Sequence, residues 1–185
     1  MAVAQEAPEL ATQENVYITG LGKVNAAITA ARLIQQHRPD TVINFGTAGG
    51  ITVGPGLHQV TKFVQRDMLC TPLGVEEGVT PFEENSKVIS FGEFGLTCST
   101  GDDFVTSGNL SIPADLVDME SYAIAKACRA AGVDFVCYKY VSDMADEKAD
   151  QDWKENHHQG QSLYLAKLQK ITLPPGESDA GSILS

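Results

Sequence analysis

The sequence is poor in basic residues. Its 185 residues include 13 lysines and arginines against 24 aspartates and glutamates, which gives a net charge of −11. Proteins that bind nucleic acid or anionic lipid present clustered positive charge, so neither is an expected partner. No apolar run approaches the ~18 residues of a membrane-spanning helix. The first ten residues lack the basic region of a secretory signal. We therefore expect a cytoplasmic protein with no membrane association.

The sequence also lacks the usual patterns of metal-binding residues. It has four cysteines, and these are Cys70, Cys98, Cys128 and Cys137. They form no CxxC pair and have no histidine at a zinc-binding spacing, so buried, reduced thiols are the ordinary explanation. His157 and His158 are adjacent in an expected helix and point in different directions, which makes a shared metal difficult. We expect neither a metal nor a cofactor.

Strand-like and helix-like segments alternate along the chain. Residues 23–37 are rich in Ala, Leu, Ile and Gln and predict a helix, whose apolar face we expect to hold Ala27, Ala30, Ala31 and Ile34. Further helices are expected at 121–131, ending on Gly132, and at 152–171. The expected strands span residues 3–4, 16–19, 41–45, 60–64, 87–91, 96–100 and 133–141.

This alternation favours an α/β fold. We expect one domain over residues 1–172, with a mainly parallel or mixed central sheet flanked by helices. Residues 173–185 lack periodicity and are expected to form a mobile tail.

Four polar or glycine-rich motifs each come directly after an expected strand. They are Gly46–Gly50 (GTAGG), Thr100–Phe104 (TGDDF), Asp118–Glu120 (DME) and Ser142–Asp143 (SD). Ligands of α/β sheets bind at the carboxyl ends of strands, so these motifs can converge on one site. Each also has an ordinary structural explanation, namely a tight turn for the glycines, helix-terminal charge for DME and a helix cap for SD. Phe104 fits either a core position or a stacking platform.

Three longer stretches carry a family resemblance, and they run from Tyr17 to Gly50, from Ser99 to Val105 and from Val117 to Glu147. They resemble the purine nucleosidase/phosphorylase superfamily, and most closely its 5′-methylthioadenosine/S-adenosylhomocysteine nucleosidases. The stretches occur in the family's order, whereas the likeness is thin between Ile51 and Leu96.

The resemblance implies a role for each matching residue. Asp143 matches the aspartate that donates a proton toward purine N7, and Ser142 matches the serine that orients this acid. Glu120 matches the glutamate that binds the ribose hydroxyls, with Met119 against the sugar. Lys139 stands where the nucleosidases more often have arginine. The positive charge is kept, but the planar guanidinium group with its paired donors is absent.

The remaining implied roles concern the base and the water. Phe104 matches the aromatic that stacks on the base, and Val105 matches the neighbour whose backbone reads the base edge. In the glycine motif, Thr47 sits near the water or phosphate position, and Gly49 lets the backbone approach the ligand. The family also places a glutamate after its first strand to activate water. Glu9 is our preferred match, with Glu6 as the alternative.

Two departures from the family pattern bear on the reaction. Only seven residues separate Glu9 from Tyr17, where the family has several tens more, forming a strand hairpin. The related phosphorylases carry an arginine two residues before the first glycine of the motif, and this chain has Asn44 there. We therefore predict hydrolysis of a purine nucleoside such as 5′-methylthioadenosine or S-adenosylhomocysteine. Phosphorolysis and a non-catalytic storage role are the alternatives. The resemblance also implies a homodimer.

Overall fold

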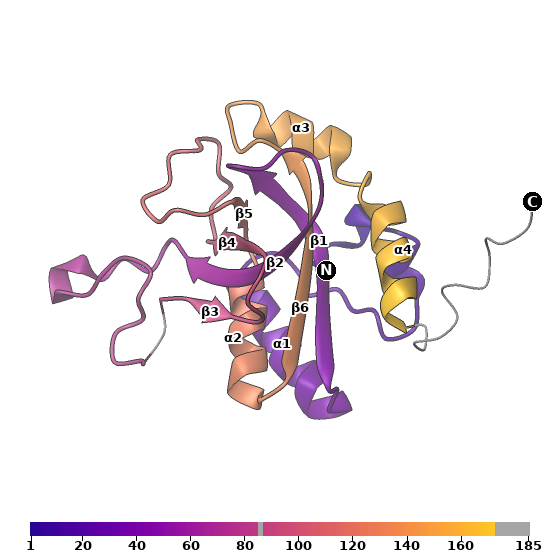
Figure 1. Cartoon of the computed structure of the whole chain (residues 1–185), viewed down its shortest axis with the longest axis horizontal. Coiled ribbons are helices and arrows are strands. Elements are labelled where there is room, and N and C mark those ends of the chain that lie inside the picture. The colour runs from indigo at the N-terminus through magenta and orange to yellow at the C-terminus, as the bar shows by residue number, and fades with distance from the viewer. Residues whose placement is uncertain (85–86, 173–185) are drawn as a thin grey trace, which may run out of the picture.

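The computed structural model describes residues 1–84 and 87–172, so the predicted tail from 173 lies outside the described residues. Its helices are α1 (Lys23–His37), α2 (Ser121–Ala131), α3 (Ala149–Asn156) and α4 (Gln161–Thr172), with short 3-10 turns at Ala4–Glu6, Leu10–Thr12 and Thr71–Leu73. Its strands are β1 (Thr41–Gly50), β2 (Gly56–Gln65), β3 (Ile89–Ser90), β4 (Leu96–Thr100), β5 (Leu116–Asp118) and β6 (Asp134–Asp143) (Figure 1).

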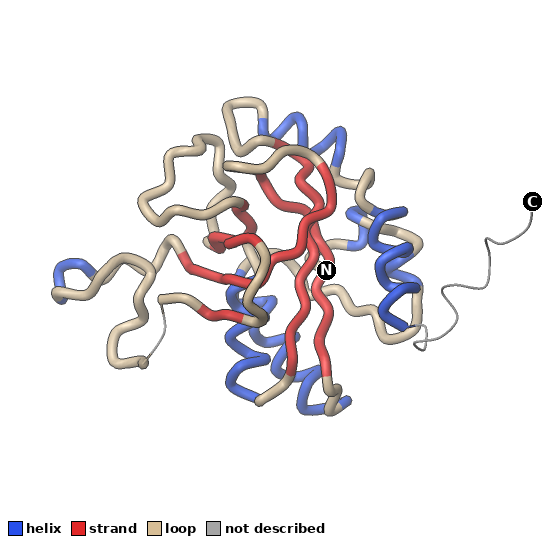
Figure 2. The backbone as a smooth tube through the Cα atoms, viewed as in Figure 1, coloured by secondary structure: helices blue, strands red, loops and turns tan. Residues whose placement is uncertain are grey.

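The strands form one mixed sheet in the order β3-β2-β4-β5-β1-β6, and β2 pairs additionally with β6. The pairs β1–β6, β2–β4 and β4–β5 are parallel, whereas β1–β5, β2–β3 and β2–β6 are antiparallel. The extra β2–β6 pairing curls the sheet until it closes on itself. Figure 2 shows the strands in the centre of the molecule and the helices around them. The prediction of a single α/β domain with a mixed central sheet is confirmed.

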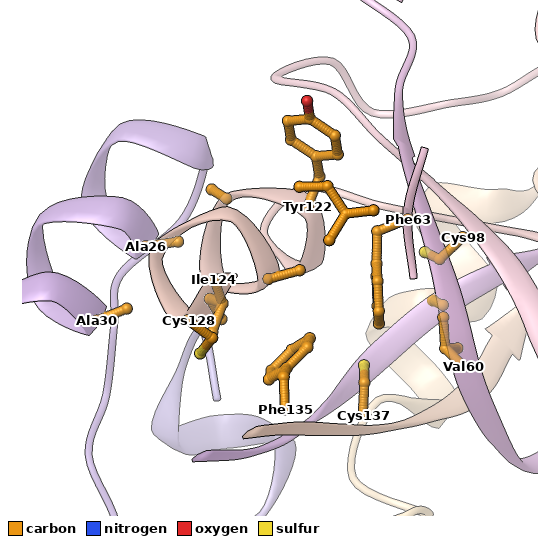
Figure 3. Packing of buried hydrophobic residues seen from close by; sticks show 14 of the residues in the cluster. Ala26, Ala30, Val60, Phe63, Cys98, Tyr122, Ile124, Cys128, Phe135 and Cys137 are labelled. Atoms are coloured by element: carbon orange, nitrogen blue, oxygen red, sulfur yellow. The ribbon is translucent and has the colours of Figure 1, made fainter. Parts of the chain in front are cut away.

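Helix α1 has the predicted bounds, but only Ala30 and Ile34 of its four predicted apolar-face residues are buried, and Ala27 is half-buried. Ala26, Ala30 and Ile34 are buried at intervals of four residues, as helical geometry requires. Ala31, which was expected on this stripe, is exposed. The small alanines let α1 pack closely against α2, and Figure 3 shows the two helices over the shared core.

The core beneath these two helices is aromatic and contains three of the cysteines. The rings of Phe63 and Phe135 lie 5.1 Å apart between centroids. Cys98, Cys128 and Cys137 are buried here as free thiols, and burial raises the pKa of Cys128 and of Cys137 to about 12. These thiols therefore remain protonated and chemically inert. The fourth cysteine, Cys70, is half-buried.

A second core lies on the other face of the sheet, under α4 and the N-terminal turns. It is built from the ring of Phe45, which contacts Tyr138 and Tyr164 at centroid distances of 5.9 and 5.2 Å. Both faces of β1 and β6 are thus covered, which explains why these long strands read as nearly continuous apolar runs. Within the described residues, no helix is both long and apolar enough to cross a bilayer.

Three predicted elements differ from the observed ones. Residues 3–4 belong to the start of a 3-10 turn, and residues 16–19 form no strand, although Thr19 and Gly20 donate main-chain hydrogen bonds to Met1 and Ala2. The single helix expected over 152–171 is two helices. The chain turns between them because Gly160 packs so closely on Tyr140 and Tyr164 that a Cβ there would lie 2.8 Å from both side chains.

Candidate active site

A cavity of about 320 Å³ opens where the strands end, and the four sequence motifs meet there. Seven of the residues singled out from the sequence line it, namely Thr47, Gly49, Phe104, Val105, Met119, Glu120 and Asp143. Ser142 precedes Asp143 in the chain, and Glu9 lies outside the cavity, whereas Glu6 lines it. The carboxyl ends of the strands therefore bring Glu120, Asp143 and the exposed aromatic ring of Phe104 into a single pocket.

Asp143 ends strand β6, and its carboxylate is held from both sides. Ser142 Oγ donates to Oδ2 at 2.9 Å, and the Ala145 backbone N–H donates to Oδ1 at 3.0 Å. These bonds explain the Ser-Asp pair, which does not cap a helix because α3 begins only at Ala149. Burial nevertheless raises the pKa of Asp143 above its usual value, and the charges of Asp152 and Asp146 add to this. A raised pKa is the direction that a general acid requires.

Gly49 faces Asp143 across the parallel β1–β6 pairing, at a point where the register shifts by a β-bulge. A Cβ atom on Gly49 would lie 2.9 Å from Asp143 Oδ1, 2.9 Å from Val117 Cγ2 and 3.1 Å from Ala145 Cβ. The glycine motif is thus more than a turn, because it lies within β1 and its missing side chain makes room for the acid.

Glu120 stands at the junction of β5 and α2, with its side chain buried against the cavity. Its Oε1 accepts a hydrogen bond of 2.9 Å from the Gly22 backbone N–H at the start of α1. Burial raises the pKa of Glu120 to about 7, and the nearby charge of Asp118 adds to the effect. Glu120 lines the pocket. Asp118 has a structural role, because its Oδ2 accepts a hydrogen bond from the Ser121 N–H at the start of α2.

The floor of the site contains a buried ion pair that crosses strand β1. Lys139 on β6 reaches over Gly46 to Asp118 on β5, with Nζ 2.8 Å from Oδ2. A Cβ atom on Gly46 would lie 3.1 Å from that Nζ, so glycine keeps the path open. Burial, the largest single influence, would lower the pKa of Lys139, but the charge of Asp118 together with those of Glu120 and the nearby Cys137 and Cys98 outweighs it and raises that pKa well above its usual value. The lysine that replaces the expected arginine is therefore a charged partner of Asp118.

Of the two candidates for a water-activating glutamate, the structure places the alternative, Glu6, in the cavity and the preferred one, Glu9, outside it. The side chain of Glu9 is exposed, and its backbone N–H donates to Gln161 Oε1 at 2.8 Å, away from the cavity. Glu6 is only 3% exposed and lines the cavity. The reason is local: the 3-10 turn at Ala4–Glu6 turns this side chain inward, whereas Glu9 precedes a separate turn on the surface.

Thr47 connects Glu6 to a residue that the sequence did not single out. Its backbone N–H and its hydroxyl both donate to Glu6 Oε1, at 2.8 and 2.7 Å. The indole Nε1 of Trp153 in turn lies 3.0 Å from Thr47 Oγ1. Trp153 is the only tryptophan in the chain and lies in a polar helix, where neither periodicity nor motif pointed to it.

Arg66 is a second residue that sequence reasoning missed, although it comes directly after strand β2 at the same edge of the sheet. Its guanidinium lines the cavity, and every one of its N–H groups is used. It donates to the carbonyl oxygens of Ser99, Gly101, Asp103 and Asp118 and to a carboxylate oxygen of Asp103. These bonds fix the loop that carries Phe104, whose ring is 47% exposed at the cavity.

An α/β fold that collects buried carboxylates, a hydroxyl and an exposed aromatic ring in one pocket at its strand ends is that of an enzyme acting on a small molecule. Residues 10–91 and 97–174 match the sequence profile of the Phosphorylase superfamily. The chain belongs to this superfamily. The matched region begins at Leu10 and so includes neither Glu6 nor Glu9.

Two relatives in the superfamily are 34% identical to this chain. The 5′-methylthioadenosine/S-adenosylhomocysteine nucleosidase of Actinobacillus succinogenes aligns over 163 residues, covering 74% of this chain and 70% of that protein. The enzyme of the same name from Haemophilus influenzae strain PittGG aligns over 189 residues, covering 87% of this chain and 79% of that protein.

A solved structure is also similar over most of both chains. It is a 5′-methylthioadenosine/S-adenosylhomocysteine nucleosidase from Neisseria meningitidis in complex with methylthio-immucillin-A. The TM-score is 0.76 at 26% identity, and the match covers 93% of this chain and 96% of that one. The similarity in fold therefore extends well beyond the motifs recognised in the sequence.

Proposed function

We propose that the chain hydrolyses the N-glycosidic bond of a purine nucleoside, with 5′-methylthioadenosine and S-adenosylhomocysteine as the expected substrates. The observation that carries this proposal is the meeting of Asp143 and Glu6 in one cavity beside Phe104 and Glu120. Cleavage of such a bond needs an acid for the leaving group and a base for water, as in glycoside hydrolysis. The names of the similar nucleosidases support the same reaction.

Asp143 is the proposed acid. The base would stack on the exposed face of Phe104, with the backbone of Val105 at its edge. Proton transfer from Asp143 to N7 lets the purine leave with the electrons of the C1′–N9 bond. The raised pKa of Asp143 supports this role, because the acid has to hold its proton until the bond breaks.

Glu6 is the proposed base for the attacking water. Two hydrogen bonds from Thr47 fix its Oε1, which leaves Oε2 to accept the proton of a water molecule. The water oxygen then bonds to C1′ as the sugar becomes oxocarbenium-like. Glu120, with Met119 beside it, is placed to hold the ribose hydroxyls, and its charge would stabilise the cationic transition state.

Hydrolysis is favoured over phosphorolysis by the bonding of Arg66. Phosphorylases hold phosphate with cationic side chains, most effectively arginine. Arg66 is the arginine that lines the described cavity, and all five of its N–H groups donate to protein oxygens. Lys139 is likewise engaged by Asp118 beneath the floor. Both cationic side chains are thus held by protein oxygens, Arg66 through all five of its N–H groups.

The test is release of adenine from 5′-methylthioadenosine, measured with and without phosphate. We expect turnover in phosphate-free buffer. Asp143→Asn should reduce kcat by at least about 10²-fold, the usual contribution of a general acid, with smaller effect on binding. Glu147→Gln, on an exposed residue nearby, is the matched control and should remain active. Strict dependence on phosphate would make the protein a phosphorylase, and an unchanged Asp143→Asn rate would remove Asp143 from the mechanism.

We also propose that the chain forms a homodimer and works in the cytoplasm. Val24 and Ile28 on α1 are 67% and 63% exposed, and Leu21, two residues before the helix, is 55% exposed and also lines the cavity. A row of large exposed apolar side chains is typical of an interface. The free thiols fit a reducing compartment. Light scattering should give the mass of two chains, and Val24→Asp with Ile28→Asp should give one.

A further inference from the structure

Helix α3 reaches the active site through one side chain, that of Trp153. The helix packs against β6 above the strand ends (Figure 1). Trp153 lies 106 residues after Thr47 in the sequence. The indole ring is held in place from its other side, since the ring of His157 stacks on it at 4.8 Å and His157 Nδ1 lies 2.9 Å from the Trp153 carbonyl oxygen. Trp153 therefore presents its Nε1 in a defined direction, toward Thr47.

The chemistry of these groups sets the direction of each hydrogen bond. An indole N–H can only donate, so Thr47 Oγ1 is the acceptor in the 3.0 Å contact with Trp153. A hydroxyl that accepts there still has one proton to donate, and its other neighbour is Glu6 Oε1 at 2.7 Å. The three side chains thus form a one-way relay, from indole N–H to hydroxyl to carboxylate. Hydrogen bonds arranged in this way strengthen one another.

The relay has a consequence for Glu6. Without the indole, the Thr47 hydroxyl could rotate and donate elsewhere, and Glu6 Oε1 would keep only the 2.8 Å bond from the Thr47 backbone. With the indole in place, Oε1 is committed to two donors. The remaining oxygen, Oε2, has one long contact of 3.3 Å from the Val3 N–H and so keeps lone pairs available, on a residue that lines the cavity.

We propose that Trp153 is a positioning residue, which orients the Thr47 hydroxyl and through it holds Glu6 ready to take the proton of the attacking water. This inference rests on the proposed function, because it assigns Trp153 to the base side of that reaction. Trp153 itself exchanges no proton. Its effect should therefore appear in the rate of the chemical step more than in substrate affinity.

The first test is Trp153→Phe, which keeps an aromatic ring against His157 and removes the N–H. We expect kcat to fall about 3- to 10-fold, the effect of one neutral hydrogen bond, with KM changed less than about 2-fold. The decisive comparison is the double variant with Thr47→Val. Since the relay passes through the hydroxyl, Trp153→Phe should have no further effect on kcat in the Thr47→Val background. In the Thr47→Ser background, which keeps the hydroxyl, the full effect should return.

A second readout does not depend on activity. Because Trp153 is the only tryptophan, the emission of the protein under excitation that is selective for tryptophan reports on this residue alone. Glu6→Gln removes the charge at the far end of the relay without touching the indole. We expect it to shift the emission maximum, and we expect Thr47→Val to shift it further. Should Trp153→Phe fail to fold, these two variants still decide the matter.

The outcomes separate this inference from the proposed function. If wild-type protein released no base from 5′-methylthioadenosine, the proposed function would fail, and the emission of the Glu6→Gln variant would still test the relay. If wild-type protein is active but the effects of Trp153→Phe and Thr47→Val multiply, Trp153 acts independently of Thr47 and the inference is overturned. Emission that is unchanged in both Glu6→Gln and Thr47→Val overturns it as well.

Discussion

Replacing Gly49 by alanine should disable the acid with a single methyl group. The new Cβ would lie 2.9 Å from Asp143 Oδ1 and from Val117 Cγ2, closer than such atoms approach in folded proteins. Val117 is buried in β5 and has little freedom to move. The Asp143 carboxylate must therefore shift away from its bonds to Ser142 and Ala145.

The expected size of the effect follows from these contacts. A methyl group forced into a packed region costs about 1–3 kcal/mol of the free energy of unfolding, or about 2–12 °C in Tm for a domain of this size. Displacing a reacting group by about 1 Å costs about 10²-fold in rate. We therefore expect Gly49→Ala to lower kcat about 10²-fold, with KM less affected. Adenine release and thermal unfolding measure the two effects.

Gly54→Ala is the matched control, because a Cβ there has no atom within 4 Å. It should leave kcat and Tm close to those of the wild type. The reasoning would be refuted by a Gly49→Ala variant that keeps wild-type kcat, since the close approach of β1 to Asp143 would then have no role in placing the acid.

Three further predictions concern the charged groups around the cavity. Because the folded state raises the pKa of Glu120 from 4.5 to about 7, Glu120 costs stability as the pH rises through this range. In urea unfolding, Glu120→Gln should stabilise the protein at pH 8 but not at pH 4.5, and equal effects at both would contradict this. Lys139→Met leaves Asp118 buried and unpaired, and should lower the free energy of unfolding by about 3–5 kcal/mol, with partial recovery on adding Asp118→Asn. Arg66→Lys cannot reproduce the five hydrogen bonds, so steady-state kinetics should show KM rising about tenfold as the Phe104 loop loosens, and an unchanged KM would contradict this.

The position of the site could be predicted from the sequence because ligands of α/β sheets bind at the carboxyl ends of the strands. Each of the motifs around Thr47, Phe104, Glu120 and Asp143 follows or ends a strand, and the fold brings strand ends together. The same rule, applied to the strand ending at Gln65, would have found Arg66. It was missed because its segment has little family likeness and its role consists of bonds to backbone carbonyls, which leave no motif.

Other parts of the site could not be read in advance. Glu6 and Glu9 lie three residues apart in a segment of two 3-10 turns with no periodicity, so only the turn geometry decides which carboxylate enters the cavity. Trp153 reaches Thr47 because α3 folds back over β6, a tertiary contact that no local pattern in the sequence indicates. The break between α3 and α4 likewise lies at Gly160, where close packing on two tyrosines leaves no space for a side chain.

The triple pairing of β2 has a consequence for how this chain can change in evolution. Val60 is paired with Leu96 on β4 and with Cys137 on β6, while Phe63 is paired with Ile89 on β3. A slip of β2 by one residue would break all three ladders at once, so its register is locked. Arg66 directly follows β2, so these pairings fix the position of its backbone. That position does not depend on the long connection between β2 and β4. Insertions and deletions between β2 and β4 can accumulate without moving the guanidinium, which leaves this surface free to diverge while the pocket stays constant.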